Sequence, residues 1–65
     1  MKPWKSREAI AKARALGWIP LGTSGGHAKF TKDGALLVIP VHPGDLKTGT
    51  QRSIMRTLGI RPDEL

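Results

Sequence analysis

The shortness of the chain limits its fold more than any other feature. It has 65 residues and no cysteine, and a chain of this length buries only about 60% of the surface that its unfolded form exposes. Without a disulfide or a zinc–thiolate site, its stability must come from packing of its apolar side chains. We therefore expect one domain over residues 1–65. Dinucleotide-binding folds and TIM barrels are excluded, because they need several times this length.

The charge of the chain indicates what it binds. Eleven Lys and Arg stand against five Asp and Glu, which gives a formal net charge of +6. A charge of this size favours phosphate, an anionic membrane face or an acidic protein as the partner. The longest apolar run, Ala35–Ile39, is far shorter than the roughly 20 residues of a membrane span, and the first residues lack an apolar signal core. We expect a cytoplasmic protein with no membrane association.

The first segment has the pattern of an amphipathic helix. Ser6 is a good N-cap, Glu8 lies in the first turn, and Gly17 suits the left-handed residue after the helix. At about 100° per residue, four apolar residues fall within one arc: Ala9, Ile10, Ala13 and Leu16. The opposite side has three cations, which form either a solvated face or a phosphate-binding face: Arg7, Lys12 and Arg14.

The middle of the chain has the pattern of three strands. Residues 18–21 are short and bulky and include Pro20, which is typical of an edge strand. Residues 22–26 form a Gly-rich turn. Residues 27–31 alternate polar and apolar side chains, which places Ala28 and Phe30 toward the core and His27, Lys29 and Thr31 on the opposite face. Asp33-Gly34 is a hairpin signal. Residues 35–39 are apolar on both faces, which indicates a central strand or a strand whose outer face another chain covers.

A second helix follows a Pro- and Gly-containing loop. Thr50 is a plausible N-cap for a helix over residues 51–58, Gly59 ends it, and Ile60 can fold back on its last turn. Ile54, Met55 and Leu58 would face the core, with Arg52 and Arg56 outward. Residues 62–64 resemble the first turn of a further helix. The element order α-β-β-β-α predicts an α+β fold, with both helices on one face of a small three-stranded antiparallel sheet.

Metal and cofactor chemistry fit the sequence poorly, so we expect neither a metal ion nor a cofactor. His27 and His42 are fifteen residues apart, and the carboxylates are scattered without paired spacing. The Gly-rich turn lacks the Lys-Ser/Thr ending of a nucleotide-binding loop.

A single histidine among cations is sufficient for one kind of chemistry. RNA supplies its own nucleophile, the 2′-hydroxyl, beside its own electrophile, the phosphate. The protein needs only to hold the backbone, move protons and screen the growing negative charge. Histidine titrates near neutrality and can move the protons. His27 follows a glycine turn and shares a strand face with Lys29, so it is a candidate catalytic residue; a merely hydrogen-bonded surface histidine is the alternative.

The order and spacing of five sequence pieces resemble the HicA family of toxins. These pieces are Trp18 after a helix-ending glycine, Gly-Gly-His at 25–27 before a strand with Phe30, and residues 38–42, 46–50 and 53–60. The resemblance covers the chain from about Ser6 to Leu65. It implies a fold similar to the double-stranded-RNA-binding domain, an mRNA-cleaving activity, and neutralisation by a HicB-like antitoxin protein.

The resemblance also implies roles for individual residues. The Gly-Ser-His motif of the family places the catalytic histidine on His27. Where the family has its serine, this chain has Gly26, so Ser24 or Thr23 would supply a hydroxyl that orients the substrate. His42 matches the Pro-x-His of the family and makes either a structural hydrogen bond or a phosphate contact. The candidate substrate-binding residues are Ser24, Gly26, Lys29, His42, Lys47 and Arg52.

Two functions are therefore open from the sequence. The first is a metal-independent endoribonuclease toxin with His27 as general acid or base. The second is a module that grips structured RNA without cleaving it, because the charge and the fold serve both functions equally. A third possibility is that the basic surface mainly receives an acidic protein partner.

Overall fold

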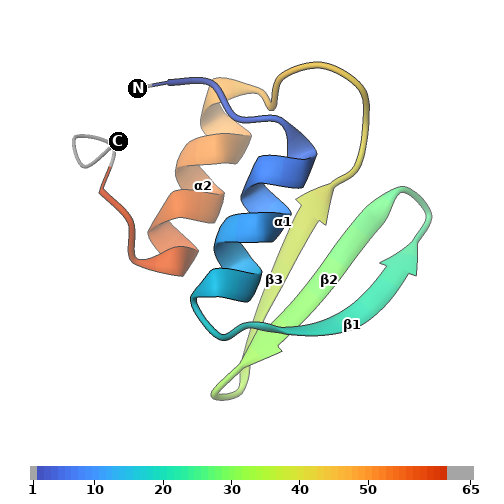
Figure 1. Ribbon diagram of the computed structural model, residues 1–65, viewed down its shortest axis with the longest axis vertical. Helices are drawn as coiled ribbons and strands as arrows, with labels where there is room; N and C mark the ends of the chain where they lie inside the picture. Colours follow the sequence, from blue (N-terminus) through green and yellow to red (C-terminus); the bar gives the residue numbers. More distant parts are fainter. Residues whose placement is uncertain (1, 62–65) are drawn as a thin grey trace.

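The chain folds as a helix, three strands and a second helix (Figure 1). The computed structural model describes residues 2–61. Its elements are α1 (Ser6–Ala15), β1 (Ile19–Ser24), β2 (His27–Lys32), β3 (Ala35–Pro40) and α2 (Thr48–Leu58). The predicted α+β fold with the order α-β-β-β-α is confirmed. Residues 62–64, which resemble the start of a further helix in the sequence, lie outside the described residues.

Two tight antiparallel hairpins build the sheet in the order β1-β2-β3. Each hairpin loop has two residues with positive φ, namely 59° and 77° at Gly25 and Gly26, and 50° and 82° at Asp33 and Gly34. Positive φ at both positions is what a two-residue hairpin turn requires. The Asp33-Gly34 prediction is confirmed. Of the two alternatives for residues 35–39, the central strand is wrong, because β2 is central and β3 is an edge strand. The other alternative, an outer face that another chain covers, stays a prediction.

Strand β1 is longer than the sequence suggests. The predicted turn over residues 22–26 is confined to Gly25 and Gly26, and the preceding residues, to Ser24, belong to the strand. The positive φ of Gly22, 108°, is accommodated within the strand because the register shifts between Pro20 and Gly22. The edge position that Pro20 predicts is confirmed.

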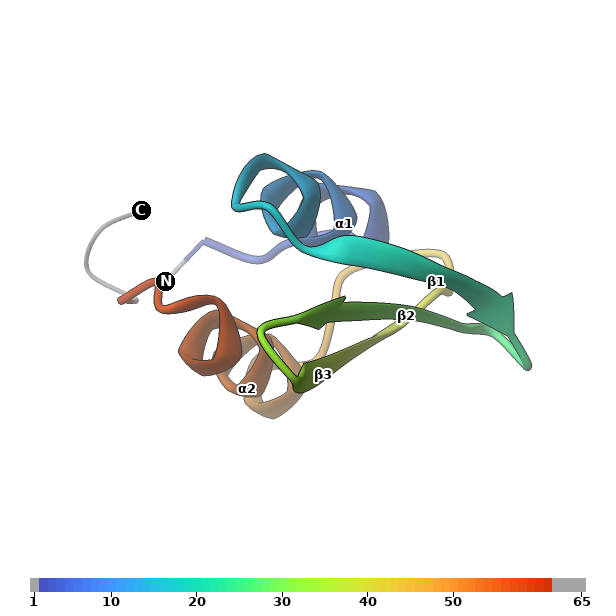
Figure 2. The same ribbon diagram turned by 90° about the horizontal axis from the view of Figure 1, so that it is seen from below.

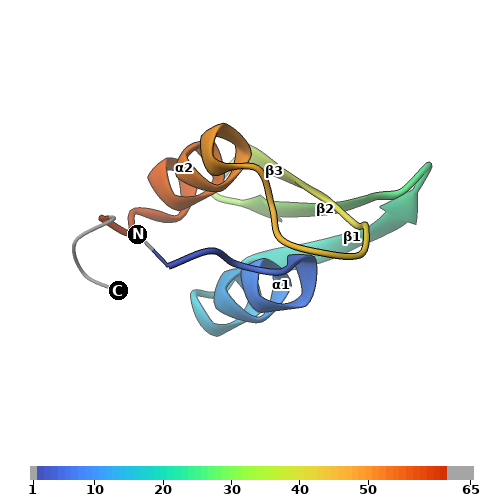
Figure 3. The same cartoon turned by 90° about the horizontal axis from the view of Figure 1, so that it is seen from above.

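Both helices cover the same face of the sheet. The alternation predicted for β2 is confirmed, since Ala28 and Phe30 are buried while His27 and Lys29 are exposed. The buried side chains of β2 and β3 form one cluster with those of the two helices. Figures 2 and 3 show α1 on the β1 side and α2 on the β3 side of this layer. The opposite face of the sheet, which we call the outer face, is covered by neither α1 nor α2, the two helices of residues 2–61.

The helices begin elsewhere than predicted. Helix α1 begins at Ser6, so the residue before it, Lys5, is the N-cap. The Ser6 side chain does not cap the helix because its Oγ donates to the carbonyl of Pro40 at 2.7 Å. Helix α2 begins at Thr48, with Lys47 rather than Thr50 as the N-cap. The predictions of Ser6 and Thr50 as N-caps used only the preference of these residue types for that position. The role of Ser6 is decided instead by its bond to Pro40, 34 residues away.

The helix ends agree with the sequence. Gly17 and Gly59 have φ of 88° and 77°, and Ile60 donates its N–H to the carbonyl of Met55 at 2.9 Å, which folds the chain back on the last turn of α2. Ile54, Met55 and Leu58 are buried as predicted. None of the helices within residues 2–61 has the length and apolar character needed to cross a membrane.

A buried glutamine fastens the N-terminal segment to α2. Gln51 is 1% exposed; its Oε1 accepts from the backbone of Trp4 at 2.8 Å, and its Nε2 donates to the carbonyl of Lys2 at 2.7 Å. Trp4 is itself 2% exposed and belongs to the core, as does Trp18. Since these bonds satisfy the amide, its burial costs little.

Candidate functional site

The tip of the β1–β2 hairpin fixes the position of His27. Val41 N–H donates to the carbonyl of Gly26 at 2.7 Å, which ties the turn to the segment after β3. The ring Nδ1 of His27 lies 3.0 Å from the carbonyl oxygen of Gly25. A carbonyl oxygen only accepts, so Nδ1 holds the hydrogen. In the neutral ring Nε2 is then unprotonated, which is the form that a general base needs.

Three of the candidate residues meet on the outer face. Ser24 is the cross-strand partner of His27, and such partners project from the same side of a sheet. Lys29 follows two residues later on β2 and therefore lies on the same side. All three residues are exposed. The structure thus brings a histidine, a hydroxyl and an ammonium group to one open surface beside a glycine turn.

Gly26 contributes backbone rather than a side chain. Its φ of 77° is in the left-handed region that favours glycine. A Cβ at this position would meet only the Val41 carbonyl, at 4.0 Å, so conformation and not space restricts the residue. Ser24, one of the two hydroxyl residues that the sequence offers in place of the motif serine, occupies the position opposite His27.

Lys32 lies on β2 but not with this group. Its Nζ donates to the carbonyl of Leu16 at 2.6 Å, at the carboxyl end of α1. A cation at this end complements the unpaired carbonyls and the helix dipole. Lys29 therefore remains the lysine of β2 that faces outward beside His27.

His42 lies in a separate hollow of about 360 Å³ at the start of α1, lined by Lys5, Ser6, Arg7, Val41, His42, Pro43 and Gly44. The ring Nδ1 of His42 lies 2.8 Å from the carbonyl of Pro43. The backbone of His42 is held by Ser6, whose Oγ accepts from its N–H at 3.3 Å and lies 3.4 Å from its carbonyl. The loop is thus anchored by Ser6, and the His42 side chain is exposed.

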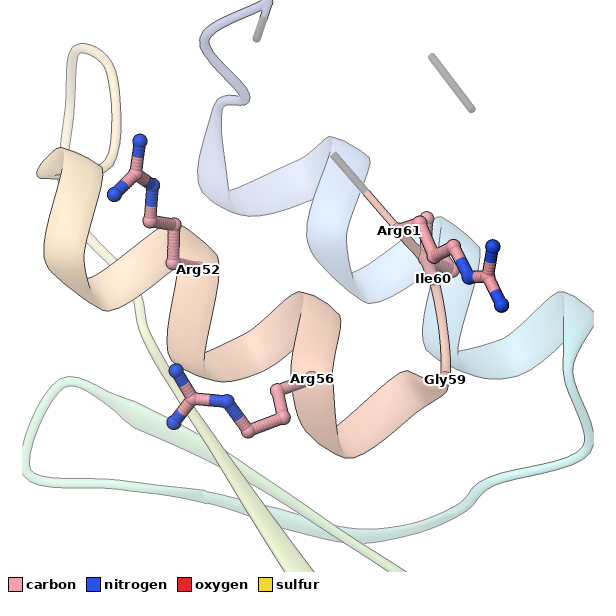
Figure 4. Close-up of a pocket in the computed structure, with 5 residues that line it drawn as sticks. All are labelled: Arg52, Arg56, Gly59, Ile60 and Arg61. Carbon is pink, nitrogen blue, oxygen red and sulfur yellow. The ribbon is translucent and has the colours of Figure 1, made fainter. Parts of the chain in front are cut away.

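Lys47 and Arg52 are not beside His27. They belong to the start of α2, and all three views place α2 at the opposite end of the molecule from the β1–β2 hairpin (Figures 1, 2 and 3). Arg52 instead lines a hollow of about 460 Å³ with Arg56, Gly59, Ile60 and Arg61 (Figure 4). Both Lys47 and Arg52 are exposed, so either can contact a long polyanion at a distance from the histidine.

Sequence reasoning missed the cations around His42. Lys5 and Arg7 line its hollow; the sequence places Arg7 on a face that is either solvated or phosphate-binding, and does not connect it with His42. Residues 34 and 36 apart are joined here by the bonds of Ser6 to Pro40 and His42. Local periodicity cannot reveal such a contact. The sequence gives no signal of it, because a serine just before an apolar helical period has the pattern of an ordinary N-cap.

One comparison with known proteins gives a match. Residues 6–60 match the model of the family described as "HicA toxin of bacterial toxin-antitoxin". The matched part begins at the first residue of α1 and includes all three strands and α2. Comparison with curated proteins gives no match.

Proposed function

The chain belongs to the HicA toxin family, and we propose that it cleaves mRNA without a metal ion, as the toxin of a toxin–antitoxin pair, with His27 as the general base. The observation that supports this proposal most is the hydrogen bond from His27 Nδ1 to the Gly25 carbonyl. It directs the basic nitrogen, Nε2, away from the turn. The same outer face presents Lys29, so a phosphate that reaches the ring also meets a cation.

The proposed reaction uses groups that RNA itself contains. Nε2 of His27 takes the proton of a ribose 2′-hydroxyl, and the 2′ oxygen forms a bond with the adjacent phosphorus. The bond from phosphorus to the 5′ oxygen breaks, and this oxygen takes a proton from solvent, which reaches the exposed ring freely. The products are a 2′,3′-cyclic phosphate and a 5′-hydroxyl.

The remaining candidates bind in this proposal. Lys29 stabilises the charge that grows on the phosphate oxygens, and the hydroxyl of Ser24 orients the ribose or the phosphate. Because Lys47 and Arg52 lie on α2, their part is to hold the RNA backbone away from the cleaved bond. His42, with Lys5 and Arg7, offers a second phosphate contact at the start of α1. The substrate places this activity in the cytoplasm.

The proposal is tested by expressing the wild type and His27→Ala from an inducible promoter in a bacterium. We expect the wild type to stop growth and fragment transcripts, and the variant to do neither. In vitro, the purified wild type should cleave RNA in EDTA and leave cyclic phosphate ends, while His27→Ala binds the RNA equally well. Full cleavage by the variant would refute the role of His27. Intact RNA with clean wild type, together with salt-sensitive binding, would favour the non-cleaving RNA-binding module instead.

A further inference from the structure

The two edges of the sheet differ in how well they are protected against pairing with another strand. The β1 edge has Pro20, which lacks an N–H, and a register shift beside it. These are devices by which proteins prevent edge-to-edge association. The β3 edge has neither along Ala35–Ile39, and it has no charged side chain there. The unprotected edge is therefore β3.

The hydrogen-bond pattern shows which groups this edge offers. The bond from Val41 N–H to the Gly26 carbonyl makes that pair a hydrogen-bonded one, and such pairs alternate along an antiparallel ladder. Counting back through the register, Leu37 and Ile39 direct their backbone groups to β2, whereas Leu36 and Val38 direct theirs away from it. The open edge thus presents the N–H and C=O groups of Leu36 and Val38. Its end is at Pro40, which has no N–H.

The side chains beside these groups are of two kinds. On the outer face, Leu36 and Val38 are 60% and 39% exposed. On the helix side, α2 lies at the β3 side of the molecule (Figures 2 and 3). Its residues Arg52 and Arg56 extend away from α1 (Figure 4). A strand added at this edge would meet an apolar surface on one face and arginines on the other.

We propose that the β3 edge is the docking site of the cognate antitoxin, which adds one β-strand to the sheet. The strand has apolar side chains that lie beside Leu36 and Val38, alternating with acidic side chains directed toward Arg56. A second copy of this chain suits the edge less well, because its net charge of +6 and its own arginines would be brought together. The proposal rests on the toxin–antitoxin role of the chain and not on cleavage of RNA.

Amide hydrogen exchange on the full chain, alone and bound to its antitoxin, tests the proposal residue by residue. We expect the amides of Leu36 and Val38 to exchange rapidly in the free chain and more than about tenfold more slowly in the complex. Leu37 and Ile39 are the internal controls, because they are already paired with β2. A complex that leaves Leu36 and Val38 unprotected overturns the proposal. So does protection in the chain alone that rises with its concentration, since this would indicate a second copy.

Two pairs of variants test the backbone and the charge separately. Val38→Pro removes an outward N–H without removing a bond to β2, and should weaken antitoxin binding by about tenfold or more; Val38→Thr keeps the N–H and should bind nearly normally. Arg56→Glu should weaken binding by about tenfold, most strongly at low salt, whereas Arg14→Glu on α1 should change it little. If Val38→Pro and Val38→Thr weakened antitoxin binding equally, no strand would be added at this edge. If Arg56→Glu and Arg14→Glu weakened it equally, the added strand would have no acidic side chains directed toward Arg56. These readouts remain valid even if the chain proves unable to cleave RNA.

Discussion

His27 and His42 are held by the same kind of bond in different surroundings. Each ring has its Nδ1 within hydrogen-bond distance of a nearby backbone carbonyl, that of Gly25 and of Pro43 respectively. His27 stands at the tip of a hairpin on the outer face. The loop of His42 is anchored to α1 through Ser6. The hollow beside His42 is lined by the first residues of that helix.

In the proposed function, the difference between these regions corresponds to a difference between reaction and binding. Around His27 the chain places the hydroxyl of Ser24 and the ammonium group of Lys29 on the same open surface as the ring, where a long substrate can reach them. Around His42 it supplies Lys5, Arg7 and a helix start, which suit an anion but offer no comparable hydroxyl on an open sheet face. We expect changes near His27 to lower the rate of cleavage, and changes near His42 to lower affinity for RNA or the stability of the fold.

The sharpest test of this comparison is to remove each ring in turn. His27→Ala should lower kcat for RNA cleavage by about 10²- to 10⁴-fold with KM nearly unchanged, because a general base acts in the transition state. His42→Ala should raise KM by less than about tenfold and leave kcat nearly unchanged, since in the proposed function His42 makes one phosphate contact and takes no part in the reaction. Single-turnover cleavage in EDTA measures both. A larger loss of kcat in His42→Ala would reverse the assignment of the two regions.

The second test concerns the cation beside His27. Lys29→Ala should lower kcat by about ten- to a hundredfold, less than a fully buried donor would, because the ammonium group is solvated. It should also reduce the slope of log affinity against log salt by about 0.7, the contribution of one phosphate on a single strand. Lys12→Ala on α1 removes the same charge elsewhere and should leave kcat unchanged. Equal effects of the two variants would show that only net charge matters.

The sequence predicts the His27 region better than the His42 region, for a physical reason. Alternation along residues 27–31 is a local signal, so the face of Lys29 follows from the chain alone. The surroundings of His42 depend on Ser6, whose partners are 34 and 36 residues away. A serine before an apolar period resembles an N-cap in any local interpretation. Only the folded structure shows that its hydroxyl bonds to the backbone of Pro40 and His42, where β3 ends and the next loop begins.

The position of β3 and the burial of Gln51 escape local sequence patterns in a similar way. Residues 35–39 are apolar on both faces, which is typical of a central strand, yet β3 is at the edge and exposes Leu36 and Val38. Burial pattern alone cannot distinguish a central strand from an edge strand that another protein covers. The burial of Gln51 does not follow from the sequence, because a glutamine in a helix is usually solvated. In the structure its side chain accepts a hydrogen bond from the backbone of Trp4, a bond that water would otherwise make.

The third test asks whether Ser6 holds the His42 loop. Ser6→Ala leaves the carbonyl of Pro40 and the N–H of His42 without their protein partner, and should lower the free energy of unfolding by about 1–3 kcal/mol. Denaturant unfolding measures this change. Ser53→Ala, at an exposed position of α2, should change stability by no more than about 0.5 kcal/mol. Equal changes in the free energy of unfolding for the two variants would show that the loop does not depend on Ser6. We expect both variants to cleave RNA at a rate within about tenfold of the wild type.

The smallest effect that we predict comes from changing the turn before His27 while keeping the His27 side chain. Gly26→Ala places a Cβ on a residue with φ of 77°, which should cost about 1 kcal/mol of stability. Because the ring of His27 follows this turn, kcat should fall several-fold as the ring shifts. Gly49→Ala makes the same change within α2, where no heavy atom lies within 4 Å of the new Cβ, and should leave stability unchanged or raise it by up to about 1 kcal/mol. A loss of both stability and kcat in Gly26→Ala, with neither loss in Gly49→Ala, would show that the backbone of the turn holds the ring of His27 in position. A Gly26→Ala variant with unchanged stability and full activity would show that the ring keeps its position without glycine at residue 26.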